Sequence, residues 1–152
     1  MIINNKEIST RLRLGFMLFA LVYMAIIVLS LIFSKSDDHM LEIVSSIIFL
    51  LFVIYFVIMR FSYIYYNSEG SKILLRYSPL QPLLYGNYSI EVPKKSLVKF
   101  EIVDGFFGLR KSLLLYVKTP QGVAKYKPVS LSTLTKKEIE QLVYNLENIV
   151  AA

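Results

Sequence analysis

The sequence predicts a membrane α-helical hairpin followed by an α+β domain. In that domain an antiparallel β-sheet or partial barrel of six to seven strands is capped by a C-terminal amphipathic helix. Two uncharged apolar runs, residues 14–33 and 43–59, predict the hairpin. From residue 61 onward, short alternating segments between turn residues predict the strands. Apolar residues at helical spacing near the end of the chain predict the helix.

The two apolar runs have the lengths of membrane spans. At about 1.5 Å per residue, the run 14–33 extends roughly 30 Å, the thickness of a hydrocarbon core. The run 43–59 is near the lower limit for a span, and the short connection requires an antiparallel hairpin. A cleaved signal peptide is the alternative for 14–33, but that run is longer than the usual apolar core and no small-residue cleavage site precedes Lys35. We therefore expect a retained transmembrane hairpin over residues 14–60.

Basic residues flank the hairpin on one side. Lys6, Arg11 and Arg13 precede the first run, Arg60 follows the second, and the connection is more acidic than basic. Because Lys and Arg collect on the cytoplasmic side, we predict a multi-pass protein of a bacterial inner (plasma) membrane with both termini cytoplasmic. Residues 1–13 are then a cytoplasmic segment. For its first ten residues the sequence leaves two alternatives, a helix on the membrane surface or a disordered stretch.

The residues next to the hairpin are typical of a membrane interface. Arg60 marks the headgroup level, and aromatic residues follow it directly. Basic and aromatic side chains anchor spans at this level, so the predicted interface anchors are Arg11, Arg13, Arg60, Phe61, Tyr63 and Tyr65. No linker precedes the first predicted strand, and the sheet is therefore expected to lie close to the membrane in a restricted orientation.

Residues 61–152 are predicted to form the cytoplasmic domain. Turn residues separate strands expected near residues 61–66, 72–77, 88–92, 97–103, 112–119 and 123–128. The strand 112–119 is the most continuously apolar and is predicted to be central. In the strand 97–103, Leu97, Lys99, Glu101 and Val103 are expected to share the solvated face. Thr135 and Glu138 form a capping box before the apolar stripe of the last helix.

This order of features resembles the PH-like domains of bacterial proteins that follow a pair of transmembrane helices. The resemblance is carried by Val92-Pro93, Leu97 to Ile102, Phe107-Gly108, Leu115 to Thr119, Gly122 and the last helix. It covers residues 61–152, and the longer segment 78–89 departs from the family's short link. The resemblance implies a PH-like fold and supplies no agreed activity.

The sequence offers no constellation for catalysis. It has no Cys and a single His, which lies in the connection between the spans. We therefore expect no enzyme, no catalytic residue, no cofactor and no metal site. Asp37, Asp38, His39 and Glu42 lack a recognised ligand spacing and are interpreted as a solvated loop. The uncharged spans argue against a channel or transporter built from this chain alone.

The candidate contact residues are basic and aromatic residues in two turns and one strand. They are Lys94, Lys95, Lys99, Phe106, Phe107, Arg110 and Lys111. In one interpretation the two Phe rings enter the lipid interface while Arg110 and Lys111 meet phosphates. In the other, the rings close the end of the sheet and the basic residues only solubilise it.

These features favour a non-enzymatic membrane protein whose tethered domain mediates assembly with a membrane-protein partner or with its own copies, as an accessory or scaffold subunit. The alternative is an anionic-lipid-surface sensor or organiser that uses the basic turns. A small channel or transport component is a third hypothesis. Membrane lipids are expected partners. Nucleic acid is not expected, because charges of both signs alternate along the domain. A small-molecule substrate is not expected either, since no enzyme is.

Overall fold

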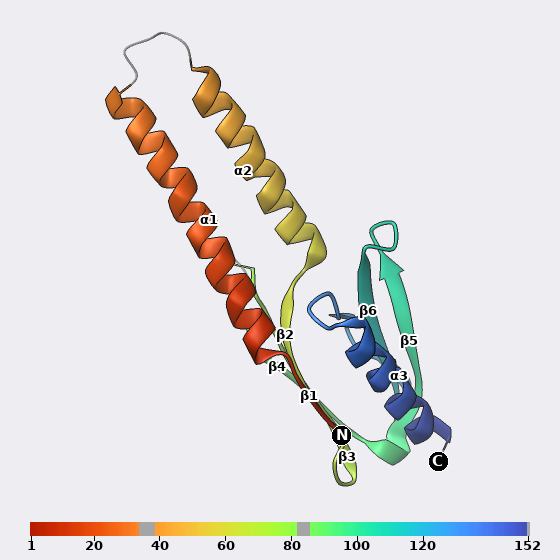
Figure 1. Cartoon of the computed structure of the whole chain (residues 1–152). Helices are drawn as coiled ribbons and strands as arrows, with labels where there is room; N and C mark the ends of the chain where they lie inside the picture. The colour runs from red at the N-terminus through yellow and green to blue at the C-terminus, as the bar shows by residue number, and fades with distance from the viewer. Residues whose placement is uncertain (34–38, 82–85, 152) are drawn as a thin grey trace.

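The computed structural model describes residues 1–33, 39–81 and 86–151 (Figure 1). Two long helices, α1 (Lys6–Phe33) and α2 (Met40–Met59), lie side by side and extend away from a smaller body of strands that carries α3 (Lys136–Ala151). Both long helices are long and apolar enough to cross a membrane, and most of their side chains are exposed. They contain the predicted runs 14–33 and 43–59. α1 begins well before residue 14, because the polar residues that precede the apolar run continue the helix without a break.

An aromatic stripe holds α1 against α2. Aromatic residues occur at matching i, i+3, i+7 spacing on both helices: Phe16, Phe19 and Tyr23 on α1, and Phe49, Phe52 and Phe56 on α2. The rings of Phe19 and Phe52, and those of Tyr23 and Phe49, have centroids 4.2 Å apart. Such ring pairs add specific geometry to apolar contact. The stripe therefore fixes the register of the two helices.

In the residues that the structure describes, eight strands form two antiparallel four-stranded sheets, which corrects the expectation of six to seven strands. The first sheet has the order β1 (Ile2–Asn4), β2 (Ser62–Asn67), β3 (Lys72–Pro79), β4 (Tyr88–Pro93). The second contains β5 (Leu97–Gly105), β6 (Arg110–Thr119), β7 (Gly122–Lys125) and β8 (Val129–Ser130), with β7 and β8 both paired to β6. No closed barrel forms in the described ranges. The turn η1 (Lys94–Ser96) after Pro93 leads the chain from one sheet into the other.

The predicted strands are present, with shifted ends, and the two additional strands are very short. β6 is central in its sheet, as its continuous apolar run predicts. β1 has three residues, of which the last is Asn4, and β8 has two residues after Pro128, so neither shows a readable alternation. Both strands form only because a longer strand, β2 or β6, offers them an edge.

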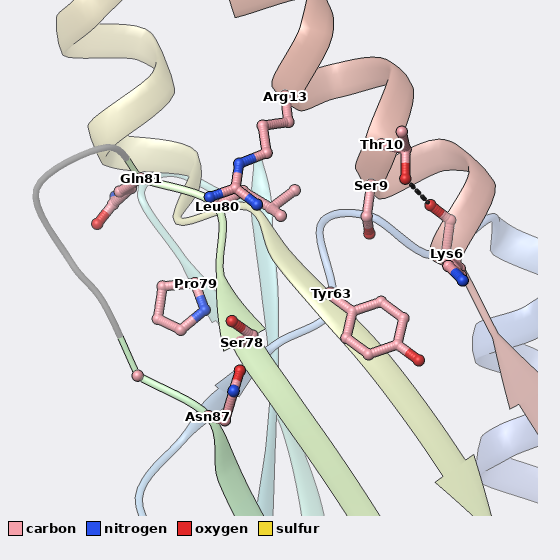
Figure 2. Close-up of a pocket in the computed structure, with 11 residues that line it drawn as sticks. Lys6, Ser9, Thr10, Arg13, Tyr63, Ser78, Pro79, Leu80, Gln81 and Asn87 are labelled. Carbon is pink, nitrogen blue, oxygen red and sulfur yellow. Dashed lines mark hydrogen bonds between the residues drawn. The ribbon is translucent and has the colours of Figure 1, made fainter.

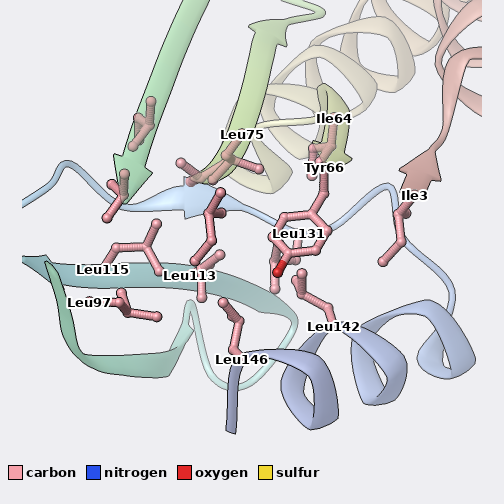
Figure 3. Packing of buried hydrophobic residues seen from close by; sticks show 14 of the residues in the cluster. Ile3, Ile64, Tyr66, Leu75, Leu97, Leu113, Leu115, Leu131, Leu142 and Leu146 are labelled. Atoms are coloured by element: carbon pink, nitrogen blue, oxygen red, sulfur yellow. The ribbon is translucent and has the colours of Figure 1, made fainter. Parts of the chain in front are cut away.

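The hydrophobic core lies between the two sheets and α3. Figure 3 shows residues of both sheets, with Leu131, meeting Leu142 and Leu146 of α3, which are 0% exposed. The prediction that Leu97 shares a solvated face with Lys99 is wrong. The register shifts between these two residues, and the irregularity turns Leu97 into the core while Lys99 stays exposed.

The last helix begins at the predicted capping box. The Glu138 backbone N–H donates to Thr135 Oγ1 at 3.3 Å, and the Thr135 backbone N–H donates to Glu138 Oε2 at 2.7 Å. A hydrogen bond joins the middle of α3 to β2: the Tyr66 hydroxyl donates to Asn145 Oδ1 at 2.8 Å. Burial raises the pKa of Tyr66 to about 12. The ring is therefore neutral and able to donate this bond at physiological pH.

Candidate functional site

Side chains of the β domain cap the C-terminal end of α2. The last carbonyls of a helix have no partner within the helix, and here three of them accept bonds from separate parts of the domain. Val57 O accepts from Gln81 Nε2 at 2.9 Å, Ile58 O from Arg110 Nη1 at 3.1 Å, and Met59 O from Ser130 Oγ at 3.2 Å. Arg110 also brings positive charge to the negative end of the helix dipole. The end of α2 is thereby fixed to both sheets.

The junction between α2 and β2 contains only Arg60 and Phe61. Arg60 adopts a left-handed conformation with φ of 47°, which ends the helix and turns the chain into the strand. Phe61 is buried and its ring lies 5.1 Å from that of Phe56. The predicted anchor Phe61 therefore packs against α2.

Asn5 joins α1 to the sheet through a buried hydrogen-bond network. Its side-chain oxygen accepts from the backbone N–H of Ile64 at 2.7 Å and from Ser9 Oγ at 3.1 Å. Its amide nitrogen donates to Thr133 Oγ1 at 2.7 Å and to the Ser62 carbonyl at 3.3 Å. Asn5 is the single residue between β1 and α1 and is 2% exposed. Both long helices therefore pass into the sheet without a flexible segment.

The β5–β6 turn presents apolar side chains beside the end of α2. Phe106, Phe107 and Gly108 all have positive φ, at 48°, 54° and 83°. For two Phe residues this backbone is unfavourable. The side chains of Phe106, Phe107 and Leu109 are 48%, 98% and 62% exposed. The Phe107 ring therefore does not close the end of the sheet. The bond from Arg110 to Ile58 O places the turn next to the last turn of α2.

The predicted contact residues fall into two separated groups. Lys94 and Lys95 lie in η1 at the start of β5, whereas Phe106 to Lys111 lie beyond its other end. A nine-residue strand spans roughly 30 Å. One flat membrane surface therefore does not meet both groups at once, and only the β5–β6 turn lies on the side of the long helices (Figure 1).

Lys99 belongs to a polar cluster on the outer face of the second sheet. Its ammonium lies 2.6 Å from Glu101 Oε1, and Tyr116 donates its hydroxyl to Glu101 Oε2 at 2.9 Å. Lys99 and Lys125 both lie over the Tyr116 ring. The hydrogen bonds from Lys99 and Tyr116 hold the pKa of Glu101 below its usual value, and the bond to Glu101 raises the pKa of Lys99. The carboxylate of Glu101 therefore offsets the positive charge of Lys99 within the cluster.

A groove separates the first turns of α1 from the outer face of the first sheet. It has a volume of about 550 Å³ and is lined on the helix side by Lys6, Thr10 and Arg13 (Figure 2). Tyr63 and Ser78, paired across β2 and β3, lie on the opposite wall. The i, i+4, i+7 spacing on α1 was visible in the sequence. The strands that face it, β2 and β3, were predicted, but their position beside α1 was not, because β1, which joins α1 to that sheet, was not recognised.

The structure brings two predicted anchors into this groove. Arg13 and Tyr63 line it, and Tyr65 lines a continuing hollow of about 890 Å³ along the same sheet face. Arg11 points elsewhere, since it pairs with Glu7 at 2.6 Å on another face of α1.

Metal-binding side chains do not gather in the described part of the chain: no group of three or more His, Asp or Glu residues is close enough to hold an ion. His39 Nδ1 lies 3.4 Å from Glu42 Oε2. Asp37 and Asp38, which accompany them in the sequence, lie outside the described residues.

Comparison with models of protein families, with curated proteins and with solved structures finds no match to this chain.

Proposed function

We propose that the protein is a non-enzymatic, multi-pass protein of a bacterial inner membrane, with both termini cytoplasmic and a PH-like domain that mediates assembly at the membrane surface. The partner is another membrane protein or further copies of this chain. Two four-stranded antiparallel sheets with a helix across their core support the PH-like assignment. The length and composition of α1 and α2, and the basic residues at their domain end, support the membrane orientation.

The observation that carries the assembly proposal is the fixed attachment of the domain to the hairpin. Each long helix is followed or preceded by a strand with no more than two residues between them. Side-chain hydrogen bonds brace both junctions. A domain held in one orientation presents the same surface to every neighbour in the membrane plane. This preorganisation lowers the entropic cost of assembly.

The surface best suited to a protein partner is the β5 edge. β5 and β7 both end the second sheet, and β5 with nine residues is the longest strand at the end of a sheet in the described residues, so it offers the longest edge to an added strand. Val98 and Val103 expose apolar side chains there, at 43% and 41%. An accessory or scaffold subunit would use such an edge without any chemistry of its own.

Gentle extraction of the C-terminally tagged full chain, followed by mass analysis of the intact assembly, tests this proposal. We expect a stoichiometric partner or a multimer. The V103E variant should lose this partner or multimer, because a charge is introduced beside the docking edge. The V123E variant, on the exposed strand β7, should keep it. A wild-type protein that is extracted as a lone protomer would contradict assembly.

A second candidate function, anionic-lipid-surface sensing or organisation, is favoured by the β5–β6 turn alone. Phe107 is almost fully exposed beside the end of α2, and apolar rings at that level enter the interface. We expect F107S to weaken contact of the turn with lipid, without loss of stability, because the Phe107 side chain is almost fully exposed and its ring contact among the described residues is with Phe106. Depth-dependent quenching of a fluorophore attached at Lys111 in nanodiscs would measure this. Equal quenching in wild type and F107S would remove this candidate.

A further inference from the structure

We propose that the groove between α1 and the first sheet is a binding site for the phosphate of an anionic phospholipid headgroup. This inference rests on the membrane orientation proposed above and is independent of protein assembly. The groove begins at Arg13, the last charged residue before the uncharged run 14–33, and follows α1 down to Lys6. The seven-residue separation corresponds to about 10 Å along the helix. The headgroup layer beside each face of the hydrocarbon core is roughly 5–8 Å deep, so the groove is long enough to cross it.

The charge of the groove fits a phosphate. Among the described residues that line it, Lys6 and Arg13 are cations and none is a carboxylate. Glu7, the nearest acidic residue in the sequence, is held by Arg11 on another face of α1. In the part of the chain that the structure describes, neither Lys6 nor Arg13 has an ion-pair partner. Two cations that face one hollow without a counter-ion favour an anion between them.

Neutral hydrogen-bonding groups complete the groove. Tyr63 and Ser78 lie on adjacent strands at one register position, and Asn87 lies beside them (Figure 2). Their side chains make no hydrogen bond to other described residues, unlike Thr10, whose hydroxyl donates to the Lys6 carbonyl, and Gln81, whose amide caps α2. Hydroxyl and amide groups in these positions match the phosphate oxygens and glycerol hydroxyls of a headgroup. Arg13 reaches toward Leu80 at the membrane end, where the acyl chains of a bound lipid would leave.

A lipid is favoured over a free phosphate compound because the groove opens where α1 enters the apolar run. Continuity between a basic groove and an apolar helix surface suits a ligand with a charged head and hydrocarbon tails. The charged residues that line the adjacent hollow along the sheet are Lys6, Arg76 and Glu91, so its net charge is positive and it extends the basic character of the groove.

The test uses the full chain in nanodiscs and in detergent. Native mass spectrometry would count retained phosphatidylglycerol against phosphatidylcholine, and a titration would give the affinity for phosphatidylglycerol. We expect wild type to retain phosphatidylglycerol preferentially. The K6Q/R13Q double variant should bind it roughly 30-fold more weakly, since each basic group near lipid contributes about a factor of five. N87D, which adds a carboxylate to the groove with little change in size, should also weaken binding.

R11Q is the matched control, because it removes the same charge two residues from Arg13 but outside the groove. If R11Q and R13Q weaken binding equally, only general surface charge acts and the site is refuted. Glycerol 3-phosphate distinguishes the source of the phosphate: we expect it to bind weakly or not at all. Tight, K6Q/R13Q-sensitive binding of glycerol 3-phosphate without retained phosphatidylglycerol would overturn the lipid assignment. Failure of the chain to enter nanodiscs would instead contradict the membrane orientation.

Discussion

Replacing Asn5 by Ala is expected to lower the free energy of unfolding by about 3 kcal/mol. The substitution removes four hydrogen bonds and leaves the buried N–H of Ile64 without its side-chain acceptor. A buried polar group deprived of its partner costs about 1–3 kcal/mol. At least two such groups are affected, since the hydroxyls of Ser9 and Thr133 also lose contacts. Urea denaturation of the full chain in micelles, followed by tyrosine fluorescence, would measure the change.

The neighbouring N4A variant is the control for this substitution. Asn4 is exposed and its side chain accepts one bond, from the backbone N–H of Lys6 at 3.1 Å. We expect N4A to cost no more than about 1 kcal/mol, the usual net contribution of one hydrogen bond. If N5A costs no more than N4A, the buried network does not brace α1 against the sheet.

Replacing Leu142 by Ala is expected to destabilise the domain by about 2–5 kcal/mol. Leu142 is 0% exposed at the centre of the face that α3 lays across the core. The deletion forfeits its burial and leaves a cavity between the sheets and the helix. Ala is a better helix former than Leu, so the loss would come from packing and not from the helix itself. The same denaturation experiment would measure it.

Tyr144 on the same helix provides the comparison. Its side chain is 68% exposed, and Y144A should change stability by less than about 0.5 kcal/mol. Similar losses for L142A and Y144A would mean that α3 does not pack as described.

Local features of this fold were predictable from sequence, because they depend on residues close together in the chain. The apolar runs, the alternation in β3 and β4, and the capping box at Thr135 all follow from short-range spacing. The central position of β6 followed from its continuous apolar character. In the strand 97–103 the alternation predicted the wrong face of the sheet for Leu97, because a one-residue irregularity reverses which face a side chain occupies.

The features that position the candidate sites depend on contacts between distant residues. Asn5 meets Thr133, and Arg110 meets Ile58, across separations that no local pattern encodes. Arg110 meets a lipid phosphate in one of the two interpretations of its turn, and the structure places its guanidinium within hydrogen-bond distance of a helix carbonyl. Lys94 and Phe107 were grouped by composition, yet a full strand separates them. The groove was not predicted because its walls come from α1 and from strands 50 and more residues later in the chain.

The central claim is that the hairpin and the β domain form one body with a fixed orientation. The chain contains no Cys, so two introduced cysteines can carry spin labels without background. Pulsed electron spin resonance on the I43C/Y144C variant in nanodiscs would measure the distance between the outer part of α2 and α3. The V98C/Y144C pair, within the domain, gives the width expected of a rigid body. The account predicts a single distance distribution as narrow as that of the domain pair. A broad or multimodal distribution for I43C/Y144C alone would show a hinge between hairpin and domain and contradict the account.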